Sequence, residues 1–193
     1  YYTNCIYDSA NSKIVIAFQD GGNSLYGTAI VGTVSGTSIS FGTKAVFNAA
    51  ESSVFIKQAY DSSSNKVIIT TMDEGNSGRG NAVVGTVSGT SISFGTNVLY
   101  STSRASAQAI AFDTVANKVV IGYSDDGNST HGTAIVGTVS GTSISFGTAA
   151  VFNSAAASQT SCSYDTGADR TIISYRNNSP SSGKVILLRL VLP

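Results

Sequence analysis

The sequence predicts an all-β protein folded as a β-propeller with four blades, and three observations lead to this prediction. The segment VGTVSGTSISFGT occurs three times without change, starting at Val31, Val84 and Val136, which are 53 and 52 residues apart. An aromatic residue followed by Asp, with Lys or Arg five positions after that Asp, recurs four times. Apolar and polar residues alternate as in strands, and no 3.6-residue helical period is present. Repeats of about 50 residues that hold four short strands are typical of propeller blades.

The repeats divide a single domain into four units. We place their boundaries at residues 1–53, 54–105, 106–157 and 158–193. The fourth unit is truncated because it ends after its third strand, so about 15 antiparallel strands are expected in place of 16. The open edge of that last unit predicts contact with a neighbouring subunit, or with further chain, since an unpaired strand invites association.

Within a unit the strands follow one another through tight turns, as the third unit illustrates. Its first strand leads into residues 109–112, and its second is expected over residues 118–124, which are rich in Val and Ile. The third covers residues 132–139 and turns at Ser-Gly into the fourth, residues 142–146. Gly in a two-residue loop supplies the positive φ that such a hairpin needs.

Most aromatic residues recur at the same place in successive units, which predicts that they form the core. One such position holds Phe47, Tyr100 and Phe152, and another holds Phe41, Phe94 and Phe146.

Composition excludes two classes of partner. Only 11% of the residues are charged, and the formal net charge is zero. A surface without excess positive charge is poorly suited to nucleic-acid backbones, so no nucleic acid is expected as partner. No apolar run approaches the roughly 20 residues of a membrane helix, so no membrane insertion is expected either.

The loops between the second and third strands vary from unit to unit, which makes them the candidate binding site. At one aligned position just before a Gly stand Tyr26, Arg79 and His131. Variable loops on a repeated scaffold are where binding specificity usually resides. The alternative is that these loops are exposed to solvent and unconstrained.

The same loops share the pattern Asp-x-Gly-Asn-Ser. A structural turn is the first interpretation, because Asp and Asn close turns by bonding their own backbone and Gly supplies positive φ. Contact with sugar hydroxyls is the second, and Ca²⁺ binding is a third that the few carboxylates support poorly. The further candidate ligand-binding residues are Asn23, Asn76, Asn128 and Asp126.

No catalytic constellation is found, so we expect no enzyme, no cofactor and no metal. His131 is the only histidine, and its equivalents in other units are Tyr and Arg, which is unlike a tuned base. The acidic residues mostly recur at equivalent positions, whereas a glycosidase needs one carboxylate pair at a set separation. A sialidase-like glycosidase is therefore the least favoured reading.

Two cysteines stand at equivalent positions in the first and last units. Cys5 and Cys162 each lie two residues before the recurring aromatic residue. If four blades close into a ring, the two would face each other at the seam and could form a disulfide, provided that their Cα atoms come within about 7 Å. If the array is open or longer, they remain free.

The unit itself resembles known repeats. The stretch NKVVIGYSDDGNS, followed by GTAIVGTVSGTSISFGT and AVF, resembles tandem propeller-type repeats in fibre and structural proteins of marine bacterial viruses and in bacterial surface proteins. The resemblance covers residues 1–182, and the tail from Gly183 departs from it. It implies an extracellular setting on a virion or cell surface, and it carries over no catalytic residue.

The Asp-x-Gly-Asn loops also resemble the Asp-box turns of sialidase-type propellers. The match is partial, because the spacer before Gly is missing, no Trp follows, and the loop lies between the second and third strands. An Asp box marks a fold and carries no catalysis.

The sequence thus predicts a non-enzymatic binding or attachment module whose partner is a glycan or another surface receptor. The alternative is a purely structural or decorating protein of a virion or surface assembly. A homo-oligomer is compatible with both.

Overall fold

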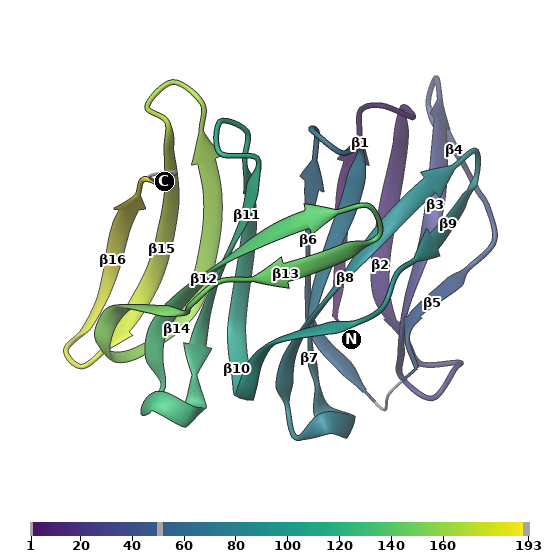
Figure 1. Cartoon of the computed structure of the whole chain (residues 1–193). Coiled ribbons are helices and arrows are strands. Elements are labelled where there is room, and N and C mark those ends of the chain that lie inside the picture. Colours follow the sequence, from purple (N-terminus) through teal and green to yellow (C-terminus); the bar gives the residue numbers. More distant parts are fainter. Residues whose placement is uncertain (1, 50–51, 191–193) are drawn as a thin grey trace.

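The computed structural model describes residues 2–49 and 52–190. It is 72% strand and 3% helix, with antiparallel sheets, which confirms the all-β prediction (Figure 1). The described residues form sixteen strands, where the sequence predicted about 15. In chain order the strands are β1 (Thr3–Asp8), β2 (Lys13–Asp20), β3 (Tyr26–Ser35), β4 (Ser38–Phe41), β5 (Ala45–Asn48), β6 (Ser53–Asp61), β7 (Lys66–Asp73), β8 (Arg79–Ser88), β9 (Ser91–Phe94), β10 (Val98–Asp113), β11 (Lys118–Asp125), β12 (His131–Ser140), β13 (Ser143–Phe146), β14 (Ala150–Asp165), β15 (Arg170–Asn178) and β16 (Ser181–Leu188).

The helices among the described residues are two short 3-10 turns, η1 (Glu74–Asn76) and η2 (Asp126–Asn128). Neither has the length or the apolar character that crossing a membrane would require.

Each unit is an antiparallel sheet whose strands follow chain order. In the first unit β1 pairs with β2, β2 with β3 and β3 with β4, while β5 pairs with β3 beyond the end of β4. The hairpin between β3 and β4 turns at Gly36, which has a φ of +59°, as the repeated Ser-Gly-Thr requires.

The recurring Asp closes the turn between the first and second strands. Oδ1 of Asp113 accepts hydrogen bonds from the backbone N–H groups of Val115 and Ala116, at 3.0 and 2.8 Å. The equivalent Asp residues of the other three units bond their own turns in the same way. The repetition of this Asp is therefore explained by backbone geometry.

Two long strands carry the chain from one unit to the next, which the sequence did not predict. The first part of β10 pairs with β8 of the second unit, and its second part pairs with β11 of the third. β14 joins the third and fourth units in the same manner. In the fourth unit β14, β15 and β16 make three strands, as expected for a truncated copy.

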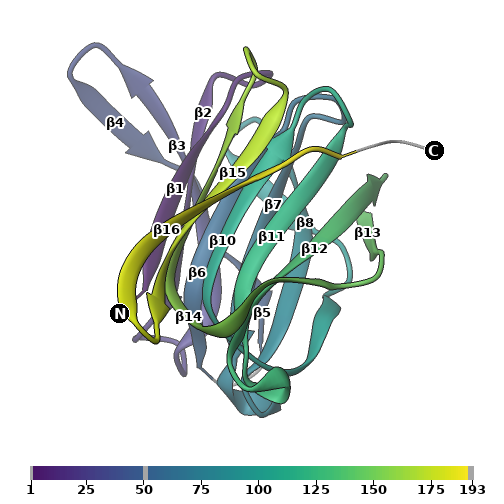
Figure 2. The same cartoon turned by 90° about the vertical axis from the view of Figure 1, so that its left-hand side faces the viewer.

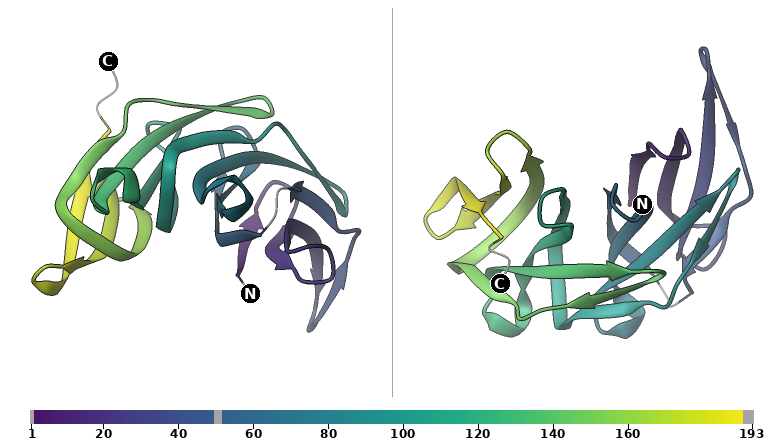
Figure 3. Two further views of the ribbon diagram at one scale, coloured as in Figure 1. Left: turned by 90° about the horizontal axis from the view of Figure 1, so that it is seen from below. Right: turned by 45° about the horizontal axis from the view of Figure 1, so that its top comes forward.

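Neighbouring units pack through their first strands, β1 against β6, β6 against β10 and β10 against β14. The units follow an open arch, with the N-terminal and C-terminal units at its two ends (Figure 3). No closed ring is formed within the described residues. The propeller and its number of blades therefore stay predictions.

The core lies between the units. One cluster joins Val15 and Val31 of the first unit to Val67 and Ile69 of the second. Equivalent clusters lie between the second and third units and between the third and fourth, where Ile173 is fully buried.

The repeated aromatic position explains a repeated glycine. The rings of Phe47, Tyr100 and Phe152 lie directly on the glycine that is the second residue of the third strand of their units, and a Cβ there would overlap each ring. Phe47 and Tyr100 are buried, as predicted for core residues.

Candidate functional site

The variable loops and the segments that lead from unit to unit lie on one face of the molecule. We call this face the loop rim and define it as residues 20–26, 73–79 and 125–131 together with residues 52–53, 101–105 and 153–157, which lead from unit to unit. It forms the lower edge of Figure 1. Backbone hydrogen bonds join each loop to the residue from which the chain enters the next unit: Ser53 N–H to Leu25 O, Ala105 N–H to Gly78 O and Ala157 N–H to Thr130 O, at 3.2, 3.0 and 2.9 Å.

Two of the three loops are closed by their leading Asp. Oδ1 of Asp20 accepts from the Gly22 N–H at 3.1 Å, and Oδ1 of Asp125 accepts from the Gly127 N–H at 3.0 Å. The ammonium of Lys44 lies 3.0 Å from the second oxygen of Asp20, and this hydrogen bond lowers the pKa of Asp20. These contacts support the structural-turn interpretation of the Asp.

The positions of the loop side chains do not support metal binding. Among the residues that the structure describes, no three side chains of His, Cys, Asp or Glu gather closely enough to hold an ion.

Tyr26, Arg79 and His131 take the same place in their sheets. Each begins the third strand of its unit, paired with the Asp that ends the second strand. All three are half-buried. Within the described chain no hydrogen bond or ion pair joins them to one another; the guanidinium of Arg79 lies 3.4 Å from Oδ1 of Asn76 in its own loop. They form a row of separate positions along the rim.

The remaining candidates lie at the tips of the loops. Asn23, Asn128 and Asp126 are exposed, and Asn76 is half-buried. The rim therefore presents amide and carboxylate groups beside the row of larger side chains.

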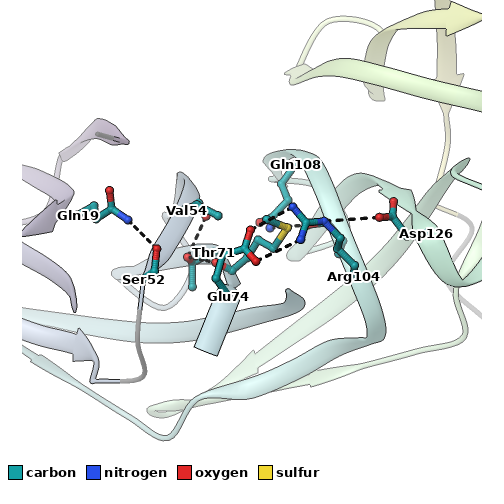
Figure 4. Close-up of polar contacts among 10 residues, drawn as sticks. Gln19, Ser52, Val54, Thr71, Glu74, Arg104, Gln108 and Asp126 are labelled. Carbon is teal, nitrogen blue, oxygen red and sulfur yellow. Dashed lines mark hydrogen bonds and ion pairs between the residues drawn. The ribbon is translucent and has the colours of Figure 1, made fainter. Parts of the chain in front are cut away.

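An ion-pair network links two loops of the rim and was not foreseen from the sequence (Figure 4). The guanidinium of Arg104 binds both carboxylate oxygens of Glu74, at 3.0 and 3.1 Å, and its Nε lies 3.6 Å from Oδ2 of Asp126. Partial burial raises the pKa of Asp126, an effect that Arg104 opposes. Asp126 is thus engaged within the protein, unlike Asn23 and Asn128.

Uncharged groups link the first and second units at the equivalent place on the loop rim. The amide of Gln19 donates to Oγ of Ser52 at 3.1 Å (Figure 4). The backbone N–H of Glu74 donates to the Ser52 carbonyl at 3.2 Å. Ser52 and Arg104 are equivalent positions of successive units. The network could have been predicted from the sequence, because an acidic residue in the loop, Glu74, is combined with a basic residue, Arg104, at the position that Ser52 holds in the preceding unit.

The first strands enclose a second group of polar side chains. A cavity of about 200 Å³ is lined by strands of all four units, including Asn4, Lys57, Gln58 and Cys162. Gln58 is buried, and neither polar atom of its amide has a hydrogen-bond partner among the residues that the structure describes. The candidate residues of the loop rim do not line this cavity.

The two cysteines are free in the structure, so the disulfide considered from the sequence is not formed. Cys5 is exposed, whereas Cys162 is half-buried and packs in the core between the third and fourth units. Burial raises the pKa of Cys162 to about 12, so its thiol stays protonated near neutral pH and is a poor nucleophile.

Comparison with known proteins gives no identification. No protein-family model matches the chain, and no curated protein matches it in sequence.

Proposed function

We propose that the chain is a non-enzymatic binding module of the β-propeller type, which recognises a neutral glycan on a virion or cell surface through the loop rim. The observation that carries this proposal is the row formed by Tyr26, Arg79 and His131. One register position of a repeated scaffold holds three different large side chains on one face. Such side chains can stack on a sugar ring or donate to its hydroxyl groups.

The rim is held in shape before any ligand arrives. Its loops are closed by Asp-to-backbone bonds and tied to the next unit by backbone hydrogen bonds. A site that is already ordered loses little conformational entropy on binding, which favours affinity. The low charge of the chain suits a neutral ligand better than an anionic one.

The acidic residues of the rim support a binding role over hydrolysis. Asp20 is bonded to Lys44, while Glu74 and Asp126 are bound by Arg104. Carboxylates held in ion pairs serve the architecture of the loops, whereas a glycosidase needs one group that can donate a proton.

The propeller and the surface setting belong to the same proposal. The first strands of neighbouring units pack against one another and the short strands lie at the outer edges, and this packing supports the propeller proposal. The resemblance to repeats of viral fibre and bacterial surface proteins supports the extracellular location.

A glycan array tests the proposal. The wild-type chain should bind at least one class of neutral glycan. A triple variant, Tyr26→Ala with Arg79→Ala and His131→Ala, should lose that binding while its melting temperature stays nearly unchanged. The matched control replaces the exposed serines that begin the next strand of each unit, Ser38 of β4, Ser91 of β9 and Ser143 of β13, with Ala, and should bind like the wild type. A folded wild-type chain that binds no glycan would contradict the proposal, and turnover of a sialoside would replace it with the glycosidase reading.

A purely structural or decorating role is the second candidate. It is favoured by the apolar surface that stays exposed at both ends of the array, including Val34 and Leu187.

A further inference from the structure

Neighbouring units are joined by one interface that recurs along the chain. One side is the outer hairpin of the following unit, and the other is a sheet face of the preceding unit. In the second unit, Val87 of β8 and Ile92 of β9 are only 7% and 6% exposed. They pack in one cluster with Val15 and Val31 of the first unit. Ile144 of β13 is buried against the second unit in the same way.

The backbone of the hairpin also fits this interface. A Cβ on Gly42 of the first unit would overlap the carbonyl oxygen of Thr90, which belongs to the hairpin of the second unit. The same overlap relates Gly95 of the second unit to Thr142 of the third. Each hairpin therefore lies directly on a glycine of the unit before it.

The first unit leaves its own hairpin uncovered. Val34 and Ile39 are the equivalents of Val87 and Ile92, yet they are 58% and 44% exposed. Phe41 is exposed as well. The hairpin of β3 and β4 projects away from the rest of the molecule (Figure 2). We call Val34, Ile39 and Phe41 the hairpin face.

The fourth unit leaves the opposite side uncovered. In the first unit Val15 pairs with Val31, and both are fully buried under the second unit. The equivalent pair in the fourth unit is Ile172 with Leu187, and Leu187 is 61% exposed. Val185, two residues earlier on β16, is 62% exposed. We call Ile172, Val185 and Leu187 the sheet face.

We propose that a second copy of this chain binds end to end, with the hairpin face of one copy packed on the sheet face of the other. The two faces are equivalent to the apolar side chains on the two sides of the interface that the chain already forms between its own units. Both are apolar, so their burial drives the association. Because unlike faces meet, the contact is head to tail and gives a closed ring or a longer chain of copies. The inference is independent of the proposed glycan.

Two variants, each with one face blocked, test this assembly by sedimentation. The hairpin-face variant carries Val34→Lys and Ile39→Lys, and the sheet-face variant carries Val185→Lys and Leu187→Lys. The wild-type chain should self-associate, and each variant should need roughly tenfold or more higher concentration to do so. An equimolar mixture of the two variants should form a heterodimer, because each retains the face that the other lacks.

The control is Val115→Lys, which places one lysine at a valine of similar exposure, 59%, in the turn after β10 and outside both faces. It should assemble like the wild type. All variants change exposed side chains, and circular dichroism checks that they fold. A wild-type chain that stays monomeric at concentrations on the order of 100 μM overturns the inference. Self-association of either blocked variant by itself at the concentration at which the wild type associates overturns it too, since the blocked face would then not be needed for the contact.

Discussion

At the scale of single residues, one unit buries a hydroxyl group at a position where two other units hold an apolar ring. Tyr100 occupies the position that Phe47 and Phe152 hold in their units. Its hydroxyl is buried and has no hydrogen-bond partner in the described part of the chain. Burial raises its pKa well above the usual value, so the hydroxyl stays neutral. The hydroxyl therefore contributes a desolvation cost and no bond.

Replacing Tyr100 with Phe should stabilise the fold by about 1 kcal/mol, because the unpaired hydroxyl is removed and the ring is kept. Urea unfolding of both proteins measures the difference.

The same chemical change at Tyr60 is the control. The Tyr60 hydroxyl accepts from the Ala10 N–H and bonds Oδ1 of Asn65, both at 3.2 Å. Tyr60→Phe should therefore lower the stability by about 0.5–1 kcal/mol. Equal effects at the two positions would show that the buried hydroxyl is not the cause.

At the scale of elements, the identical hairpins do not all have the same surroundings. Gly42 and Gly95 each lie under the hairpin of the next unit. Gly147 is the third member of the series, but no atom of a following hairpin lies within 4 Å of a Cβ placed there. The fourth unit provides no such hairpin, since β16 is the last strand of the described chain.

Alanine should therefore have different effects at three positions that are identical in local sequence. Gly42→Ala and Gly95→Ala should each destabilise by about 1–3 kcal/mol, because the methyl group displaces the neighbouring hairpin. Gly147→Ala should stay within about 0.5 kcal/mol. Thermal unfolding of the three variants checks this, and a comparable loss at Gly147 would contradict the described packing.

The sequence could predict the strands of a unit but not the contacts between units. Repetition, alternation and the Ser-Gly turn placed the second, third and fourth strands, since these depend on local geometry. The long strands β10 and β14 could not be predicted, because pairing on both sides is decided by the neighbouring units. Arg104 was missed for the same reason: its partners Glu74 and Asp126 lie in two different units. The row of Tyr26, Arg79 and His131 was predictable as a set of equivalent positions, and its role stays a prediction.

At the scale of the whole molecule, burial is greatest in the middle of the array. β7 and β11 are buried over most of their length on both faces. β4 and β16 are largely exposed. In a chain whose units contact only their neighbours, stability is the sum of the units and of their interfaces. The end units have one interface fewer.

Amide exchange followed by NMR in dilute solution should therefore be slowest in β7 and β11 and fastest in β4 and β16. The expected difference is a gradient from the middle units toward both ends. Uniform protection across the array would instead show that it opens as a single cooperative unit.

The direct repetition of one hairpin, and of the glycine beneath it, also bears on how such a chain can change in length. The two junctions among the first three units place the same hairpin on the same glycine, Thr90 on Gly42 and Thr142 on Gly95. Duplicating or deleting the second unit would therefore preserve this hairpin contact and change the number and order of the rim loops. Genetic recombination between the identical segments would lengthen or shorten the array in steps of one unit.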